Sequence, residues 1–263
     1  YVVVIAKIFA ASTAGFYFFA NKLKELVIAQ IVKAIQTVTY PALASMQDDN
    51  TRLKAGYRKV IGVTTFLLFP VMLFLAALAD PLFEFALPAK WLPAVVYLQL
   101  MCFAGLIHPL HSINLNVLQV KGRSDLFLYL EVVKKILLVI ILSISIHFGI
   151  RGILIGQIIS SVLAYLPNSY FTVKLINYSV REQLADFMPG LILSAAVAGG
   201  TYLSITLVAW HPLLELILFG SLGAALYLIG AYHFKLQALH LAFDMIQERR
   251  GKKAPKNAAP VVS

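Results

Sequence analysis

Charged side chains interrupt a stretch of this sequence that is otherwise apolar enough to cross a membrane. The stretch is GFYFFANKLKELVIAQIVKAIQTVTYPAL, residues 15–43. A charge near the centre of a bilayer costs about 2.5–3.5 kcal/mol on insertion scales, so such residues usually face protein or a water-filled cavity. At 100° per residue, one side of a helix here carries Lys22, Glu25, Lys33, Gln36 and Tyr40. We therefore predict that this side lines a substrate cavity.

Within this predicted cavity wall, Lys22 and Lys33 are candidates for attracting an anionic headgroup. Glu25 is a candidate for charge balance or ion coupling, and Gln36 and Tyr40 are candidates for lining. Lys24 falls on the opposite, apolar side of the helix, where we expect its side chain to snorkel toward the outer headgroups. Lys24 is therefore placed outside the predicted site.

A second apolar stretch, residues 126–148, carries Glu131 with Lys134 and Lys135 three and four positions later. This spacing makes a compact ionic cluster on one arc of a helix. One interpretation is an ion-pair network near the membrane interface that neutralises itself. The other is a cavity wall in which Lys134 and Lys135 attract an anionic headgroup and Glu131 balances charge or couples an ion.

Polar residues also follow one another in GLIHPLHSINLNVL, residues 105–118. Pro109 predicts a kinked helix, because proline lacks the backbone donor that an unbroken helix needs. His108 and His111 have a spacing that can bind metal, but no Asp, Glu or Cys lies nearby in sequence, so we predict no metal site. His108 and Asn114 are instead candidates for lining the cavity or packing between helices.

Composition predicts an all-α, polytopic membrane bundle. The 263 residues are 60% hydrophobic and only 13% charged, whereas soluble domains are about a quarter charged. The net charge of +10 does not imply nucleic-acid binding, because no basic face is interleaved with exposed aromatic residues. Cys102 is the single cysteine, which excludes an intrachain disulfide and a cysteine-cluster metal site. No cofactor is predicted.

Apolar stretches of about 20 residues predict the membrane spans. The predicted spans are 16–44, 60–79, 92–118, 126–148, 152–173, 187–210 and 212–234, with residues 1–12 as the end of an eighth. The chain opens in an apolar run without Met, and we expect it to be the C-terminal part of a longer protein. Ser179 and Glu182 have the spacing of a capping box, which predicts a short surface helix before the span at Phe187.

Basic residues predict the orientation of the spans. About fourteen fall in alternate connections or after the last span: Arg52, Lys54, Arg58, Lys59, Lys121, Arg123, Lys174, Arg181, Lys235, Arg249, Arg250, Lys252, Lys253 and Lys256. The other connections hold only Lys90 and Arg151. By the positive-inside rule the first group is cytoplasmic, and so is the C-terminus. We expect the tail ERRGKKAPKNAAPVVS, residues 248–263, to be disordered and to bind anionic lipid headgroups, with a protein partner as the alternative.

Three stretches together resemble the polysaccharide transporter family of Wzx-type oligosaccharide flippases. They are GFYFFANKL through VTYPALASMQDDNTRLKAGYRKV, then VKGRSDLFLYLEVVKKILLVIILSISIHFGIRGILIGQ, then KLINYSVREQLADFMPGLILS. The resemblance implies a MATE-like architecture of two six-helix lobes with two additional helices. Residues 1–175 would be the C-terminal transport lobe with its first helix truncated, 176–235 two additional helices preceded by the surface helix, and 236–263 a basic cytoplasmic tail.

The resemblance also implies a function. Family members move undecaprenyl-pyrophosphate-linked oligosaccharide, such as an O-antigen unit of lipopolysaccharide, across the bacterial inner membrane by alternating access. The implied partners are this substrate, membrane lipids, the missing N-terminal lobe, and glycan polymerases or glycosyltransferases. A multidrug or cation exporter of the same superfamily is one alternative, against which the net positive charge argues. A membrane-embedded glycan polymerase, ligase or acyltransferase is another, against which the short outer connections argue, so we predict no enzyme activity.

Overall fold

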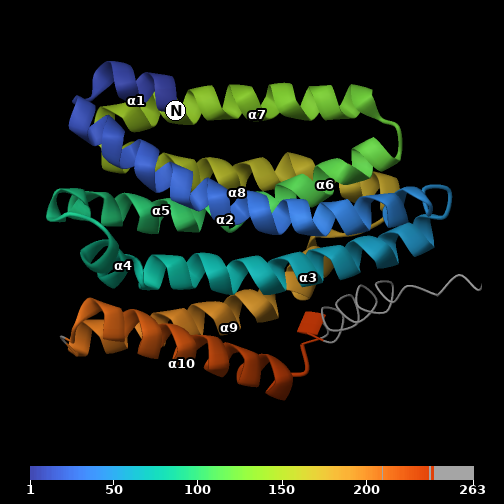
Figure 1. The fold of residues 1–263 in the computed structure, drawn as a ribbon. Coiled ribbons are helices and arrows are strands. Elements are labelled where there is room, and N and C mark those ends of the chain that lie inside the picture. The colour runs from blue at the N-terminus through green and yellow to red at the C-terminus, as the bar shows by residue number, and fades with distance from the viewer. Residues whose placement is uncertain (209, 237, 240–263) are drawn as a thin grey trace, which may run out of the picture.

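The computed structural model describes residues 1–208, 210–236 and 238–239, and in these residues every regular element is a helix (Figure 1). The elements are α1 (Val2–Ile8), α2 (Ala11–Ala44), α3 (Asn50–Ala77), α4 (Ala79–Ala86), η1 (Ala89–Ala94), α5 (Val95–Gly105), α6 (His108–Val120), α7 (Ser124–Ser145), η2 (Ile146–Phe148), α8 (Gly149–Ile176), α9 (Val180–Leu207) and α10 (Pro212–His233). The all-α prediction is confirmed. Most of the predicted tail lies outside the described residues.

The long helices run back and forth along one direction, as Figure 1 shows. Six stretches of the described chain are long and apolar enough to cross a membrane. One of them, Ser124–Ile176, contains both α7 and α8, which η2 joins and which run in opposite directions (Figure 1). The predicted spans therefore correspond to α2, α3, the α5–α6 pair, α7, α8, α9 and α10. This is a multi-pass membrane protein.

The predicted kink is a short interruption of the helix between α5 and α6, where Leu106 and Ile107 keep helical dihedrals. α5 ends at Gly105 and α6 begins at His108, with a turn at Leu106 and Ile107. Pro109 occupies the first turn of α6, where its missing N–H is not needed by the helix. The two halves together still make one crossing of the bundle.

The capping box is confirmed, but the separate surface helix is wrong. The Ser179 hydroxyl accepts from the Glu182 N–H at 3.3 Å, and the Glu182 carboxylate accepts from the Ser179 N–H at 2.9 Å. These contacts begin α9 itself, which continues unbroken through Pro189 to Leu207. Residues 180–186 lack a breaker between the cap and the apolar run, so the polar turns and the span form one helix.

The basic connections meet at one end of the bundle. Lys121 donates to Asn50 at 2.6 Å and also to the Gln47 carbonyl, joining the α2–α3 and α6–α7 connections. Lys54 donates to the Asn177 carbonyl at 2.7 Å and pairs with Glu182 at 2.8 Å, which joins α3 to the α8–α9 connection. The prediction that these alternate connections lie at the same end of the bundle is thus confirmed. Several of the basic residues lie in the first turns of helices and not in loops. The cytoplasmic location of this end stays a prediction.

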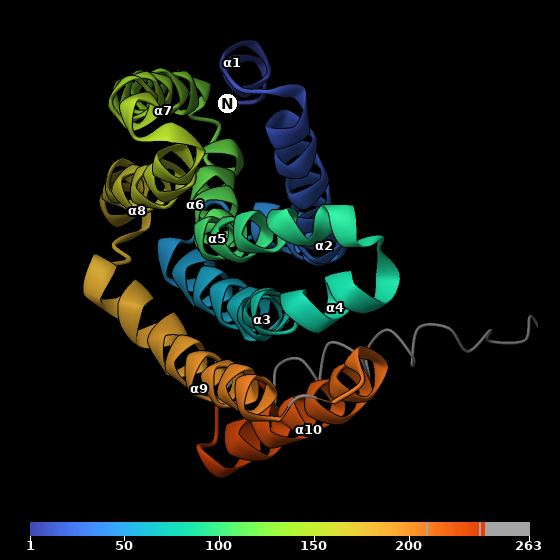
Figure 2. The same ribbon diagram turned by 90° about the vertical axis from the view of Figure 1, so that its left-hand side faces the viewer.

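Helix α7 lies at one side of the bundle, and α9 and α10 lie at the other (Figure 2). One apolar core joins α2, α3, α5 and α8 through side chains such as Ile28, Met72, Leu98 and Leu154. α9 packs along α3 on the side away from α7, and α10 packs on α9 (Figure 2). The domain boundary near residue 175 stays a prediction.

Candidate functional site

Lys24 is buried in the bundle, contrary to the prediction that it reaches the outer headgroups. Its side chain is 11% exposed, and its Nζ lies 2.9 Å from Asn21 Oδ1 and 3.0 Å from Glu25 Oε1. The face of α2 that packs against the other helices contains Tyr17, Ala20, Lys24, Ile28 and Ile35. The apolar side of α2 is therefore a contact with protein and not with lipid, which is why Lys24 does not snorkel.

Gly105 makes room for the side chains of Met72 and Ile28, and the stem of Lys24 lies beside it. A Cβ at Gly105 would lie 3.5 Å from the Lys24 Cδ, and only 2.8–2.9 Å from Met72 and Ile28 atoms. Gly105 is the last residue of α5, so the stem of Lys24 reaches the C-terminal end of that helix. A helix C-terminus carries partial negative charge, which favours a nearby ammonium group.

The other predicted residues of α2 lie on its less buried side. Lys22, Lys33 and Tyr40 are exposed, and Glu25 is half exposed beside Lys24. Within the described part of the chain, neither Lys22 nor Lys33 takes part in an ion pair. Their ammonium groups are thus open to a charge that this chain does not supply.

Gln36 connects this side of α2 to α6. Its Nε2 donates to the Ser112 hydroxyl at 2.6 Å. α6 in turn contacts α7, so it lies between the two helices that carry the predicted charges (Figure 2).

His108 is exposed at the start of α6, close to charges from both neighbouring helices. Lys24 and Glu25 of α2 and Lys134 of α7 all lie within electrostatic range of its ring. On α7, Lys134 forms an ion pair with Glu131. We use the name ionisable face for these residues together with the two exposed lysines of α2: Lys22, Lys24, Glu25, Lys33, His108, Glu131 and Lys134. It combines four ammonium groups with two carboxylates, so its net charge is positive.

Lys135 lies apart from the Glu131–Lys134 pair. It is exposed, on the side of α7 that also exposes Leu128, Val132 and Val139. The structure therefore brings together two members of the predicted three-residue cluster and places the third on an apolar surface.

Asn114 is 1% exposed and contacts other helices. Of its two predicted roles, lining the cavity and packing between helices, it has the second in this structure. Its Oδ1 accepts from the Thr172 hydroxyl of α8 at 3.1 Å, and its Nδ2 lies 3.4 Å from Gln183 Oε1 of α9. Gln183 also accepts from the Tyr165 hydroxyl at 2.7 Å and donates to the Tyr178 carbonyl at 3.1 Å. This buried network joins α6, α8 and α9.

The two histidines do not form a metal site in the described residues. No group of three or more His, Cys, Asp or Glu side chains there could hold a metal ion. His111 is instead held between helices, with Nε2 3.0 Å from the Ser161 carbonyl and Nδ1 2.6 Å from Asn168 Nδ2. Its ring packs α6 against α8, whereas His108 belongs to the ionisable face.

The sequence of this chain is similar to those of known polysaccharide biosynthesis proteins. The family described as "Polysaccharide biosynthesis protein" matches residues 1–96. The chain is 28% identical over 167 residues to the lipopolysaccharide biosynthesis protein WzxC of Escherichia coli (strain K12), covering 62% of this chain and 34% of that protein. It is 23% identical over 230 residues to the teichuronic acid biosynthesis protein TuaB of Bacillus subtilis (strain 168), covering 86% of this chain and 48% of that protein. These matches confirm the resemblance to polysaccharide transporters.

A solved structure has the same fold. The lipid II flippase MurJ, in an inward closed conformation, superimposes with a TM-score of 0.73 at 17% identity, covering 88% of this chain and 49% of that one. This chain thus spans about a third to a half of the length of the relatives and of the structure it matches.

Proposed function

We propose that this chain, a relative of the polysaccharide transporter family, is part of a flippase for lipid-linked oligosaccharide in the bacterial inner membrane. The cargo would be an undecaprenyl-pyrophosphate-linked unit of a surface polysaccharide, moved by alternating access. The ionisable face would attract the pyrophosphate, with Lys22, Lys33 and Lys134 in the predicted roles. The remaining length of the relatives leaves room for a second lobe, which would close the cavity opposite this face.

The observation that carries this proposal is the pair of α2 lysines, Lys22 and Lys33, that form no ion pair with the described residues. Lys22 and Lys33 lie about 8 Å on either side of the midpoint of α2 at 1.5 Å per residue. Placing an ammonium group in hydrocarbon at such a depth is energetically unfavourable. A water-filled cavity that receives an anionic headgroup removes this cost, and at an effective dielectric of 20 a phosphate charge 5 Å away contributes roughly 3 kcal/mol.

The same charge disfavours the rival transporter. A cation or cationic drug would meet a net positive face, and at the same distance the interaction would be repulsive by a similar amount. The named relatives are biosynthesis proteins and the named structure is a flippase, so we also propose a transport role without catalysis. The basic end of the bundle, and with it the C-terminus, would face the cytoplasm.

The test is glycan export by cells whose full-length protein carries Lys22→Gln and Lys33→Gln. We expect surface glycan to fall at least tenfold while the amount of membrane-inserted protein is unchanged. The matched control is Lys174→Gln, which removes an exposed charge at the basic end of the bundle.

Each rival predicts a different result. A polymerase would leave single glycan units on the surface and shorten the chains, and a drug exporter would leave the glycan intact and alter drug accumulation. Full-length glycan at the normal level in the double variant would also refute the proposal.

A further inference from the structure

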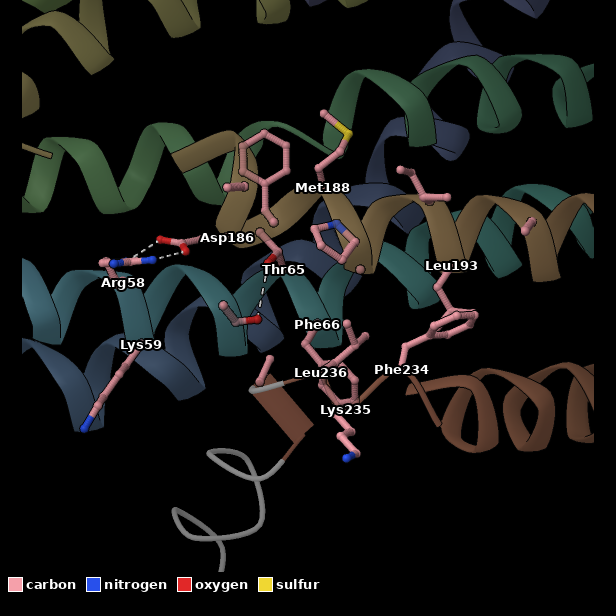
Figure 3. A pocket seen from close by; sticks show the side chains of 18 residues that line it. Arg58, Lys59, Thr65, Phe66, Asp186, Met188, Leu193, Phe234, Lys235 and Leu236 are labelled. Carbon is pink, nitrogen blue, oxygen red and sulfur yellow. Dashed lines mark hydrogen bonds and ion pairs between the residues drawn. The ribbon is translucent and has the colours of Figure 1, made fainter. Parts of the chain in front are cut away.

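A groove opens between α3, α9 and the residues after α10 (Figure 3). Helices α9 and α10 lie on the side of α3 away from α6 and α7 (Figure 2). The volume of the groove is about 1020 Å³, and most of its lining is apolar. The apolar lining includes Phe66, Ile192, Leu193, Ala196 and Leu236. The proposed function makes no use of this groove.

Three basic residues are among those that line the groove. Arg58 and Lys59 come from α3, and Lys235 follows α10 (Figure 3). Lys59 and Lys235 are exposed and extend away from the apolar lining (Figure 3). Neither of them forms an ion pair in the part of the chain that the structure describes. The rim is thus positively charged.

Among the described residues that line the groove, the one carboxylate, Asp186, is already paired. Arg58 donates to both oxygens of Asp186, at 2.8 Å and 2.6 Å, and the Tyr178 hydroxyl donates to Oδ2 at 2.6 Å. Burial, with the hydrogen bond to Asp186, raises the pKa of Tyr178, so its hydroxyl remains a donor. Asp186 therefore does not cancel the charges of Lys59 and Lys235.

The depth of the groove matches one leaflet of a bilayer. Asp186 lines its basic end and Ala196 its far end, both on α9. Ten residues of helix rise about 15 Å, which is half of the roughly 30 Å hydrocarbon core. A lipid whose headgroup sits at the basic rim would have its acyl chain along this apolar wall.

We propose that this groove binds one anionic glycerophospholipid of the bilayer. Its anionic headgroup would lie at the rim that Arg58, Lys59 and Lys235 make basic, and an acyl chain would follow α9 past Ile192. Basic pockets between transmembrane helices bind anionic headgroups for the same electrostatic reason. This inference does not depend on the proposed flippase activity.

The test measures lipid retained by the purified full chain in native mass spectrometry. The probes are phosphatidylglycerol and phosphatidylcholine with identical acyl chains. We expect one phosphatidylglycerol to be retained in preference to phosphatidylcholine. Lys59→Ala with Lys235→Ala should weaken this retention roughly 25-fold, equivalent to about 2 kcal/mol for two interfacial lysines.

Two further variants separate the groove from general attraction to the basic protein. Lys174→Ala removes a charge at the same end but outside the groove lining, and should retain the lipid. Ala196→Trp fills the apolar wall without changing charge, and should lose it. Equal retention of both probes, equal loss in the Lys174 variant, or an unchanged Ala196 variant would overturn the proposal. Retention of a polyprenyl phosphate in place of phosphatidylglycerol would overturn it as well.

Discussion

Replacing Lys24 with Met separates a structural role of this buried ammonium group from a role in cargo attraction. The Lys24 Nζ is bound by Asn21 at 2.9 Å and Glu25 at 3.0 Å, and its stem lies against Gly105. Methionine has an unbranched, flexible side chain, so it can keep the packing of the stem. The variant therefore removes the charge and leaves little empty space.

The expected effect on stability is small and favourable. Burying an ammonium group costs several kcal/mol, and its ion pair returns only part of this. Glu25 is half exposed, which screens the pair to about 1 kcal/mol. We therefore expect Lys24→Met to be neutral or to stabilise by up to about 2 kcal/mol, a rise in Tm of up to about 8 °C.

Glu25→Gln is the complementary change, because it leaves the Lys24 ammonium with only Asn21 and the end of α5. It should lower the Tm by about 2–4 °C, the equivalent of about 1 kcal/mol. The two variants are predicted to move stability in opposite directions, although each removes one charge of the same pair.

The assay combines the apparent Tm of the detergent-solubilised full-length protein with glycan export in cells. If Lys24 helps the ionisable face to attract cargo, Lys24→Met should export poorly while its Tm is unchanged or higher. Leu23→Met, at the neighbouring half-buried position, is the control for side-chain shape. A fall of more than 5 °C with Lys24→Met would show that the ammonium is structural, and normal export would remove it from the cargo site.

Two further predictions concern α9. Gln183→Leu should lower the Tm by about 5 °C, because Asn114 and Tyr165 lose a buried acceptor. The control is Gln119→Leu at an exposed position. An unchanged Tm in both variants would mean that the network contributes little to stability. Ser179→Ala should cost about 1 kcal/mol through the lost cap, measured as a fall in Tm of 2–4 °C, and Ser179→Asp should restore it. Failure of Asp to rescue would point to a role for Ser179 other than capping.

The positions of the helices could be predicted because local signals determine them. Apolar stretches of sufficient length set the spans, Pro109 marks the start of α6, and the Ser179–Glu182 capping box marks the start of α9. Asp49 is a further local signal, since it caps α3 by accepting from Thr51 and Arg52 at 2.9 Å and 3.1 Å. This cap starts α3 about ten residues before the predicted span at residue 60.

The surroundings of the charged residues could not be predicted in the same way. In a sequence that is 60% hydrophobic, the side of a helix that packs on protein and the side that faces lipid have similar residues. Lys24 and Lys135 show the consequence, since one is buried and the other is exposed beside apolar residues. Gln183 was missed because its partners Asn114 and Tyr165 come from other helices, and no local spacing connects them.

The break between α5 and α6 and the burial of Lys24 explain one another. A broken helix at membrane depth leaves carbonyl groups of its last turn without partners, and it is tolerated where that backbone is buried in protein or lines a water-filled cavity. Here the Lys24 stem contacts Gly105 at the end of α5, and His108 begins α6 within range of its charge. A continuous helix would use those carbonyls internally and would leave Lys24 with Asn21 and Glu25 alone. The interruption before Pro109 therefore places the partial negative charge of a helix end close to the Lys24 stem, which lowers the cost of this ammonium group in the ionisable face.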